Sequence, residues 1–323
     1  MTKSQVKEQK SRVQAVQQKI LDSVLILFAI SMIIYFTAAS PYFLSLKNFM
    51  NILSSVSVVG IIATAMTLVM ITRGIDLSVG STIALTGCVS AILIVNLSMH
   101  WLLAIMVTLL IGAIVGIFNG VLITKFKVVP FIATLGSMNM FRGLAFILTN
   151  GQAIYVPDKM ITFIGTGKVF GLIPIPAIIM MLFFVIFWAI TKFTVFGRNV
   201  FAVGGNSVAS RLAGIPVLKL TLTLYVLTGV LSAIAGLVMT GLTSTAMPSA
   251  GDGYNLDTIT AVYLGGNSAN GGEGSVWRTF MGILIIGILN NGMALLSIQS
   301  YWQTFVKGSL LIAAVVFDML RRK

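Results

Sequence analysis

Long apolar stretches separated by short polar segments dominate this chain. They cover residues 21–39, 52–72, 78–98, 101–124, 128–148, 169–191, 220–241, 279–297 and 303–320. Each has about the 20 residues that a helix needs to cross the hydrocarbon core of a bilayer. A weaker apolar segment, Leu256 to Gly266, lies between the seventh and eighth of them. The pattern predicts an all-α integral membrane protein with nine transmembrane helices, or about ten if the weaker segment is an incomplete eighth span.

The distribution of basic residues decides between nine and ten spans. Cytoplasmic loops of membrane proteins carry an excess of Lys and Arg. With a cytoplasmic N terminus, ten spans place most of the 21 Lys and Arg residues on the cytoplasmic side, including the tail 321–323. Nine spans would expose that tail outside the cell. We therefore predict ten spans with both termini in the cytoplasm.

The N-terminal residues 1–20 form a basic leader, and residues 21–323 are expected to form a single transmembrane domain. The first apolar stretch ends at Ser40-Pro41-Tyr42. The stretch is about 19 residues long and follows a basic head of about 20 residues, whereas the apolar region of a secretory signal peptide has about 7–15 residues. We therefore interpret this stretch as the first span, with the leader lying on the headgroups or disordered.

Two pairs of segments that lie far apart in the sequence resemble each other. Residues 74–87 and 253–266 share a frame of Gly, Asp or Asn, Leu, a short polar residue and a closing Leu-x-Gly. Residues 114–120 are similar in sequence to residues 285–291, and this match aligns Asn119 with Asn290. Either match alone could arise by chance between apolar helices, but together they predict a repeat of spans 2–5 in spans 7–10. Because one span separates the halves, the repeats are inverted, as in many transporters.

Composition excludes several classes of protein. The chain is 57% hydrophobic and 9% charged, with a mean hydropathy of +1.02, which is too apolar for a soluble domain. One Cys and one His exclude a disulfide framework and a zinc site built from these residues, and leave no catalytic set for a membrane-embedded enzyme. The net charge of +13 indicates lipid headgroups, not nucleic acid, as the partner. We expect no catalytic residues and no metal site in this chain.

Neutral polar residues within the spans are candidates for a translocation pathway. Amide and hydroxyl groups can line a path for a polar solute without burial of a charge. The alternative is that they join helix to helix. The candidates are Asn119, Asn290, Thr134, Ser137 and Asn139. Asn291 points about 100° away from Asn290 and is expected to face a neighbouring helix. Arg142 is the mid-span charge without an obvious partner, and is expected either to snorkel or to face a dimer cavity.

Charged and glycine residues mark the ends of the third and eighth spans. Arg73 can pair with Asp76, and Asp76 can cap the third span. Asp257 lies at the corresponding start of the eighth span and is expected to cap it. Gly265 and Gly266 begin a glycine-rich turn at its other end. We predict that these residues have gating roles or form the ends of half-helices.

The longest cytoplasmic loop, residues 192–219, is expected to contain one short helix. Asn206 or Ser207 can cap its start, and Gly214 can end it. A helix of about two turns needs a surface to pack on. The alternative is a loop that lies on the lipid headgroups. The candidate contact residues are Gly204, Gly205, Asn206, Ala209, Arg211, Leu212, Gly214 and Ile215.

The sequence 204–215 (GGNSVASRLAGI) resembles the cytoplasmic coupling segment of ribose-type sugar permeases of bacterial ABC importers. Three further stretches resemble the same family and occur in the same order. They are residues 73–81 (RGIDLSVGS), the turn 149–151 (TNG) that follows 131–136 (FIATLG), and residues 264–274 (LGGNSANGGEG). The resemblance covers about residues 40 to 318, so the leader 1–20 lies outside the family pattern.

The resemblance implies a membrane-spanning subunit of an ATP-driven importer in the bacterial cytoplasmic (inner) membrane. Its implied partners are a second permease copy or a sister permease, an ATP-binding subunit and an extracytoplasmic sugar-binding protein. The transported solute is implied to be a monosaccharide of the pentose or hexose class, with ribose favoured and selectivity mainly in the binding protein.

The chain itself is expected to hold no cofactor, with ATP and Mg²⁺ on the separate ATPase. Consistently, it contains no Gly-x-x-x-x-Gly-Lys-Ser/Thr motif. The alternative function is an ion- or proton-coupled secondary transporter. Such carriers usually keep a carboxylate in mid-membrane, whereas the Asp and Glu residues of this chain are expected at span ends or in loops. A channel would not explain the long cytoplasmic loop.

Overall fold

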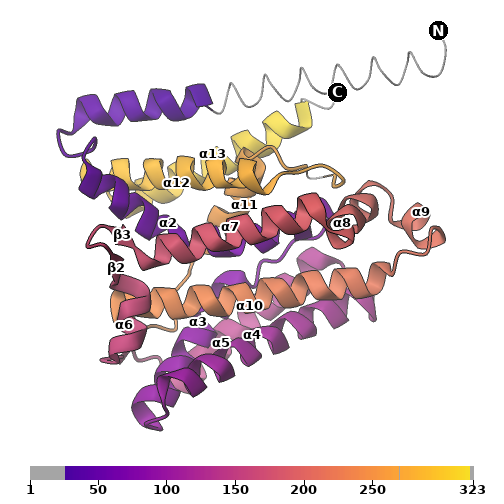
Figure 1. The fold of residues 1–323 in the computed structure, drawn as a ribbon, viewed down its shortest axis with the longest axis horizontal. Helices are drawn as coiled ribbons and strands as arrows, with labels where there is room; N and C mark the ends of the chain where they lie inside the picture. The colour runs from indigo at the N-terminus through magenta and orange to yellow at the C-terminus, as the bar shows by residue number, and fades with distance from the viewer. Residues whose placement is uncertain (1–25, 269, 321–323) are drawn as a thin grey trace.

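The computed structural model describes residues 26–268 and 270–320, which are mostly helical (Figure 1). The predicted leader 1–20 and tail 321–323 lie outside the described residues. The helices are Ile26–Ala39, α2 (Leu46–Ile71), α3 (Val79–Ala91), η1 (Ile92–Asn96), α4 (Trp101–Thr124), α5 (Pro130–Thr149), α6 (Lys159–Thr166), α7 (Ile175–Phe193), α8 (Val195–Gly205), α9 (Ser207–Leu212), α10 (Val217–Thr243), α11 (Tyr254–Leu264), α12 (Val276–Leu295) and α13 (Ser300–Leu320).

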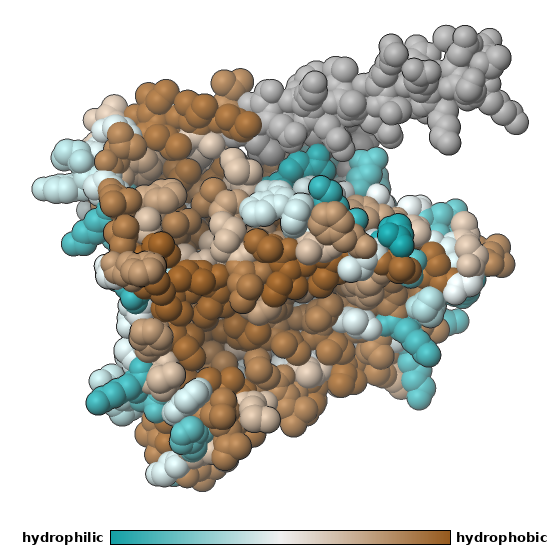
Figure 2. Space-filling view, in the orientation of Figure 1, coloured by the Kyte–Doolittle hydropathy of each residue, from teal (hydrophilic) through white to brown (hydrophobic). Residues whose placement is uncertain are grey.

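Seven helices of the described chain are long and apolar enough to cross a bilayer, which confirms the predicted class of an integral membrane protein. They are α2, α3 together with η1, α4, α5, α7, α10 and α12. The helix Ile26–Ala39 is apolar but shorter, and α11 has only 11 residues. Apolar side chains cover the middle of the molecule, and polar ones gather towards its two ends (Figure 2). This distribution is the one that a bilayer requires.

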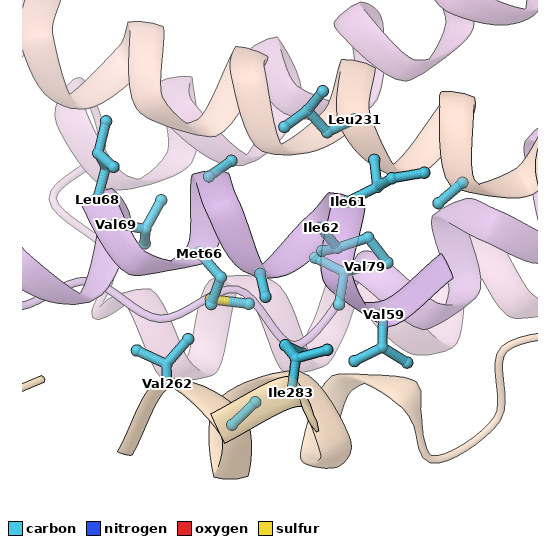
Figure 3. Close-up of a cluster of buried hydrophobic side chains, with 14 of the residues drawn as sticks. Val59, Ile61, Ile62, Met66, Leu68, Val69, Val79, Leu231, Val262 and Ile283 are labelled. Atoms are coloured by element: carbon cyan, nitrogen blue, oxygen red, sulfur yellow. The ribbon is translucent and has the colours of Figure 1, made fainter. Parts of the chain in front are cut away.

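The helix α2 forms the centre of the molecule. Of its most apolar 18-residue stretch, 83% is buried, against 28% for α4, α5 and α7. Its side chains Ile61 and Met66 belong to a cluster that also contains Leu231 of α10, Val262 of α11 and Ile283 of α12 (Figure 3). Because lipid tails are as apolar as these side chains, close packing, not exclusion of water, holds such a cluster together.

Two non-helical segments interrupt the helical bundle. Residues 72–78 connect α2 to α3, and residues 244–253 connect α10 to α11, with the short strand β4 (Thr245–Ala246) at the start of the second segment. The second segment meets the first turn of α3, where a Cβ added at Gly80 would overlap the carbonyl oxygen of Gly251. Glycine at position 80 is therefore required for this approach. Non-helical backbone of this kind is tolerated at membrane depth only where protein or a water-filled cavity surrounds it.

The strands lie together at one end of the molecule, which we call the strand end (Figure 1). The strand β1 (Ile154–Tyr155) pairs antiparallel with β4, so that Ile154 lies opposite Ala246. The strands β2 (Lys168–Val169) and β3 (Ile173–Pro174) form a second pair. The pairing of β1 with β4 joins the chain that follows α5 to the chain that follows α10.

The opposite end, which we call the loop end, carries α8 and α9 (Figure 1). One short helix was predicted in this loop, but two helices meet at Asn206, and Gly204 and Gly205 belong to α8. The predicted cap is confirmed, because Asn206 Oδ1 accepts hydrogen bonds from the N–H groups of Val208 at 3.0 Å and Ala209 at 2.9 Å. The predicted stop is also confirmed, because Gly214 has a φ of +85° just after α9.

Candidate functional site

A buried polar cluster surrounds the residues that precede α3. Asp76 Oδ1 accepts hydrogen bonds from the N–H of Ser78 at 2.9 Å and from its Oγ–H at 2.6 Å. Asn119, on α4, donates from Nδ2 to the same Ser78 Oγ at 2.8 Å. Asp76 therefore orients Ser78, the N-cap residue of α3, and does not itself cap the first turn as predicted.

The carbonyl oxygen of Ile75 connects this cluster to two further helices. Tyr225 of α10 donates to it from the phenolic hydroxyl at 3.1 Å. Thr134 Oγ1 of α5 lies 3.5 Å from the same oxygen and donates to Pro130 O at 2.8 Å. The structure thus brings together Asn119 and Thr134, two of the predicted pathway residues. Sequence reasoning missed Tyr225, since a lone tyrosine in an apolar span carries no signal of a site.

The other predicted pathway residues lie elsewhere. Ser137 is buried and donates to Thr134 O at 3.2 Å. Asn139 is exposed on α5 and donates to a carbonyl of its own helix at 3.2 Å. Asn290 is on α12. Within the described residues, the Oδ1 atoms of Asn119 and Asn290 are both buried without a hydrogen-bond partner.

The structure confirms that Asn291 faces a neighbouring helix. Its side chain exchanges two hydrogen bonds with Asn48 of α2, from Asn48 Nδ2 to Asn291 Oδ1 at 2.8 Å and from Asn291 Nδ2 to Asn48 Oδ1 at 2.9 Å. The reciprocal pair satisfies both amide groups in an apolar environment. Asn291 is therefore a packing residue between α2 and α12.

The predicted ion pair between Arg73 and Asp76 is wrong. Arg73 donates from Nε to Gly204 O and from Nη2 to Gly205 O, each at 2.8 Å. Asp76 is buried within its own turn, 2% exposed. The guanidinium therefore ties the end of α2 to the end of α8. This contact joins residues 131 positions apart, so no local pattern indicated it.

The glycine-rich turn after α11 packs against the same place. The N–H of Gly272 donates to Ile71 O at 2.8 Å. A Cβ at Gly265 would lie 2.7 Å from the backbone of Arg278, and Gly266 has a φ of +67°. The turn is thus close-packed. We use the name loop-end joint for the residues Ile71, Arg73, Gly204, Gly205 and Gly272.

The helix α9 presents apolar side chains outward. Val208 is 68% exposed and Leu212 is 85% exposed, and Ala209 and Arg211 are exposed beside them. Of the candidate contact residues, Ile215 does not lie on this helix, because it follows the end of α9, and it is half-buried. An i, i+4 pair of exposed aliphatic residues on a helix outside the apolar belt is suited to a protein partner.

Arg142 neither snorkels nor lacks a partner. Its Nη1 donates to the carbonyl oxygens of Pro248 and Ala250, each at 2.7 Å. These carbonyls belong to the non-helical segment 244–253. Arg142 thus fixes that segment to α5.

The expectation that Asp257 caps the eighth span is wrong. Asp257 lies within the first turn of α11, whose N-cap residue is Gly253, and it is buried. Its Oδ2 forms a salt bridge of 2.9 Å with Lys307 Nζ of α13. The opposite charge of Lys307 compensates this carboxylate, which joins α11 to α13.

Comparisons with known proteins agree with this architecture. The family model described as "Branched-chain amino acid transport system / permease component" matches residues 48–315. Ribose import permease protein RbsC of Haemophilus influenzae is 44% identical over 307 residues, which cover 94% of this chain and 93% of that protein. RbsC of Bacillus subtilis is 43% identical over 89% of each chain. L-arabinose transport system permease protein AraH of Escherichia coli is 36% identical over 88% of this chain and 86% of its own. No solved structure shows a significant match.

Proposed function

Because this chain belongs to the family described as branched-chain amino acid transport system / permease component, we propose that it is the membrane-spanning subunit of an ATP-driven importer. The proposed solute is a monosaccharide, with ribose favoured over an amino acid. The observation that carries this proposal is the 44% identity to a ribose import permease over 94% of the chain. Relatives named for L-arabinose support a pentose more broadly.

The proposed arrangement has ten crossings in two inverted halves, with both termini in the cytoplasm. The order of elements supports the repeat. In each half a long helix (α2 or α10) is followed by a non-helical segment, a shorter helix (α3 or α11) and two longer helices. The approach of Gly80 to Gly251 supports a shared centre for the two halves. In this arrangement the loop end is cytoplasmic and the strand end faces the binding protein.

The proposed coupling element is α9 together with the loop-end joint. The exposed pair Val208 and Leu212 would dock on a separate ATPase subunit that holds ATP and Mg²⁺. Movement of α8 would then reach α2 directly, because Arg73 bonds to the carbonyl oxygens at the end of α8. A second permease copy, or a sister permease, would complete the pathway.

Reconstitution tests the proposed function. The chain is placed in proteoliposomes with its ATPase subunit, and radiolabelled D-ribose is supplied with the binding protein. We expect uptake that requires ATP on the side of the membrane where the ATPase subunit lies. Uptake should stop when the phosphate-loop lysine of the ATPase is replaced. Unlabelled L-arabinose or leucine is then added as a competitor of ribose uptake. The comparison shows whether the transporter prefers a pentose or a branched-chain amino acid.

Two results would overturn the proposal. One is accumulation of leucine without accumulation of ribose, and the other is ribose uptake that follows an ion gradient without ATP. The second result would restore the secondary transporter as the better explanation.

A further inference from the structure

Polar side chains gather where the non-helical segment 244–253 crosses α5. Arg142 of α5 holds this segment through its two carbonyl contacts. Asp252 follows two residues after Ala250, is exposed, and interacts electrostatically with Arg142. Asn255 donates from Nδ2 to Met138 Sδ of α5 at 3.5 Å. Sequence reasoning singled out neither Asp252 nor Asn255 for binding.

This group lies within the apolar belt. Arg142 comes twelve residues after Pro130, the first residue of α5, so it lies about 18 Å along the helix axis. The neighbouring residue Gly251 packs against Gly80 in the first turn of α3. A carboxylate exposed to lipid at this depth is expensive. Asp252 must therefore face a water-filled or protein-lined space.

The adjoining face of α5 is open. A Cβ added at Gly136 or Gly143 would meet nothing within 4 Å. Asn139 lies between these glycines, at positions three and four residues away, so all three share one face of the helix. Asn139 is exposed, and Arg142 is three residues further on. The open face therefore leads directly to the polar group.

We propose that Asn139, Arg142, Asp252 and Asn255 form a sugar-binding site inside the permease, which we call the mid-membrane site. Both described hydrogen bonds of Arg142 use Nη1, so its Nε and Nη2 groups can donate to a ligand. The carboxylate of Asp252 can accept two hydrogen bonds from vicinal hydroxyls. The site carries one positive and one negative side chain, so it favours an uncharged polyol such as a pentose. This inference rests on the proposed transport function, and it adds selection to a pathway otherwise expected to be weakly selective.

A purely structural role for Arg142 is the competing explanation. In that case Arg142 only fixes the backbone at Pro248 and Ala250. The two explanations separate at Asp252 and Asn255, because neither side chain contributes to the bonds with those carbonyls. Replacing them removes ligand groups and leaves the structural contact in place.

The test is equilibrium binding of radiolabelled D-ribose to the permease–ATPase complex in nanodiscs, without the binding protein. We expect weak saturable binding to the unmodified complex. Asp252→Asn and Asn255→Ala should each weaken it about tenfold, the effect of losing one well-placed hydrogen-bonding group. Asp158→Asn serves as the matched control. Asp158 caps α6 at the strand end, a role that asparagine also fills, so its binding should equal that of the unmodified complex.

The proposal is overturned if the unmodified complex transports ribose with the binding protein but shows no saturable binding without it. Binding by both variants within twofold of the control would overturn it equally. Failure of the unmodified complex to transport ribose at all would instead count against the proposed function. Co-purification of the ATPase with each variant establishes that the variant is folded.

Discussion

At the scale of single residues, amide side chains inside the apolar belt follow two patterns. Asn48 and Asn291 satisfy each other completely, whereas Asn119 and Asn290 each leave a buried Oδ1 without a partner among the described residues. An unsatisfied buried acceptor costs about 1–3 kcal/mol. The first pattern is typical of packing. The second indicates that the missing partner arrives with water, with a solute or with another conformation.

The reciprocal pair predicts a non-additive effect on stability. Asn291→Leu leaves Asn48 Oδ1 without its donor and should lower the free energy of unfolding by about 1 kcal/mol, in the range measured for hydrogen bonds between membrane helices. The double variant Asn48→Leu/Asn291→Leu removes both amides and should recover part of this loss. Thermal unfolding of the detergent-purified protein measures both. If the losses of stability in Asn48→Leu and Asn291→Leu alone add up to the loss in the double variant, the pair contributes nothing as a unit.

The unsatisfied pair predicts an effect on transport. Asn119→Leu or Asn290→Leu should reduce sugar uptake by more than it reduces assembly with the ATPase, because each removes an acceptor that the described structure leaves free. Uptake in proteoliposomes, normalised to the amount of co-purified ATPase, measures the difference. If both variants transport at the normal rate, these asparagines are packing residues only.

Sequence patterns located the two ends of α9 well, because the partners of its end residues are close in the chain. The cap at Asn206 and the stop at Gly214 bond within a few residues, so their chemistry was readable. Arg73 and Arg142 were misjudged because their partners lie 131 and 106 residues away. These partners are backbone carbonyls, which every residue carries, so no residue type marks them.

At the scale of elements, α9 is the helix whose exposure most requires a partner. Its two exposed aliphatic residues lie beyond the apolar belt, and its ends are fixed by Asn206 and Gly214. The helix is only 6 residues long, so packing against a partner must supply stability that its own length cannot.

Charge on α9 should therefore prevent the permease from binding its ATPase. The double variant Ala209→Glu/Gly214→Glu places a carboxylate in the exposed face and a side chain where φ is +85°. We expect insertion to be retained, with loss of ATPase binding, of sugar uptake and of substrate-stimulated ATP hydrolysis. Pull-down of the ATPase in nanodiscs measures the first loss.

Ala202→Glu is the matched control, because Ala202 is an exposed alanine on α8, outside α9. It should retain ATPase binding. Normal binding and transport by the double variant would show that α9 is not the coupling element.

At the scale of the whole molecule, the fold class followed from the repeated apolar stretches of about 20 residues, because bilayer thickness sets that length. The approach of the first turn of α3 to residues 244–253 was not predictable in this way. It depends on Gly80 and Gly251 meeting across the chain, and glycine is also common in ordinary turns. The number of crossings and their direction remain predictions, since α11 and the helix Ile26–Ala39 are too short to decide by length.

Labelling of the two ends tests the topology. After replacement of the buried Cys88, single cysteines are introduced at Thr2 and at Arg322. With ten crossings and a cytoplasmic N terminus, neither should react with a membrane-impermeant thiol reagent in intact cells, and both should react after permeabilisation. A single cysteine at Lys168, at the strand end, provides the control that should react in intact cells. Labelling of either terminus from outside would exclude this topology.

The two bonds of Arg142 also affect how the protein is made. Its acceptors at Pro248 and Ala250 follow it by 106 and 108 residues. At ribosomal rates of about 5–20 residues per second, roughly 5 to 20 seconds separate synthesis of the arginine from synthesis of its acceptors. During that interval α5 carries an uncompensated guanidinium, which costs about 2.5–3.5 kcal/mol at the centre of an inserted helix. The nascent α5 is therefore less stable in the bilayer than the finished helix. It reaches its full stability only when residues 248–250 have been synthesised and accept the hydrogen bonds of Arg142.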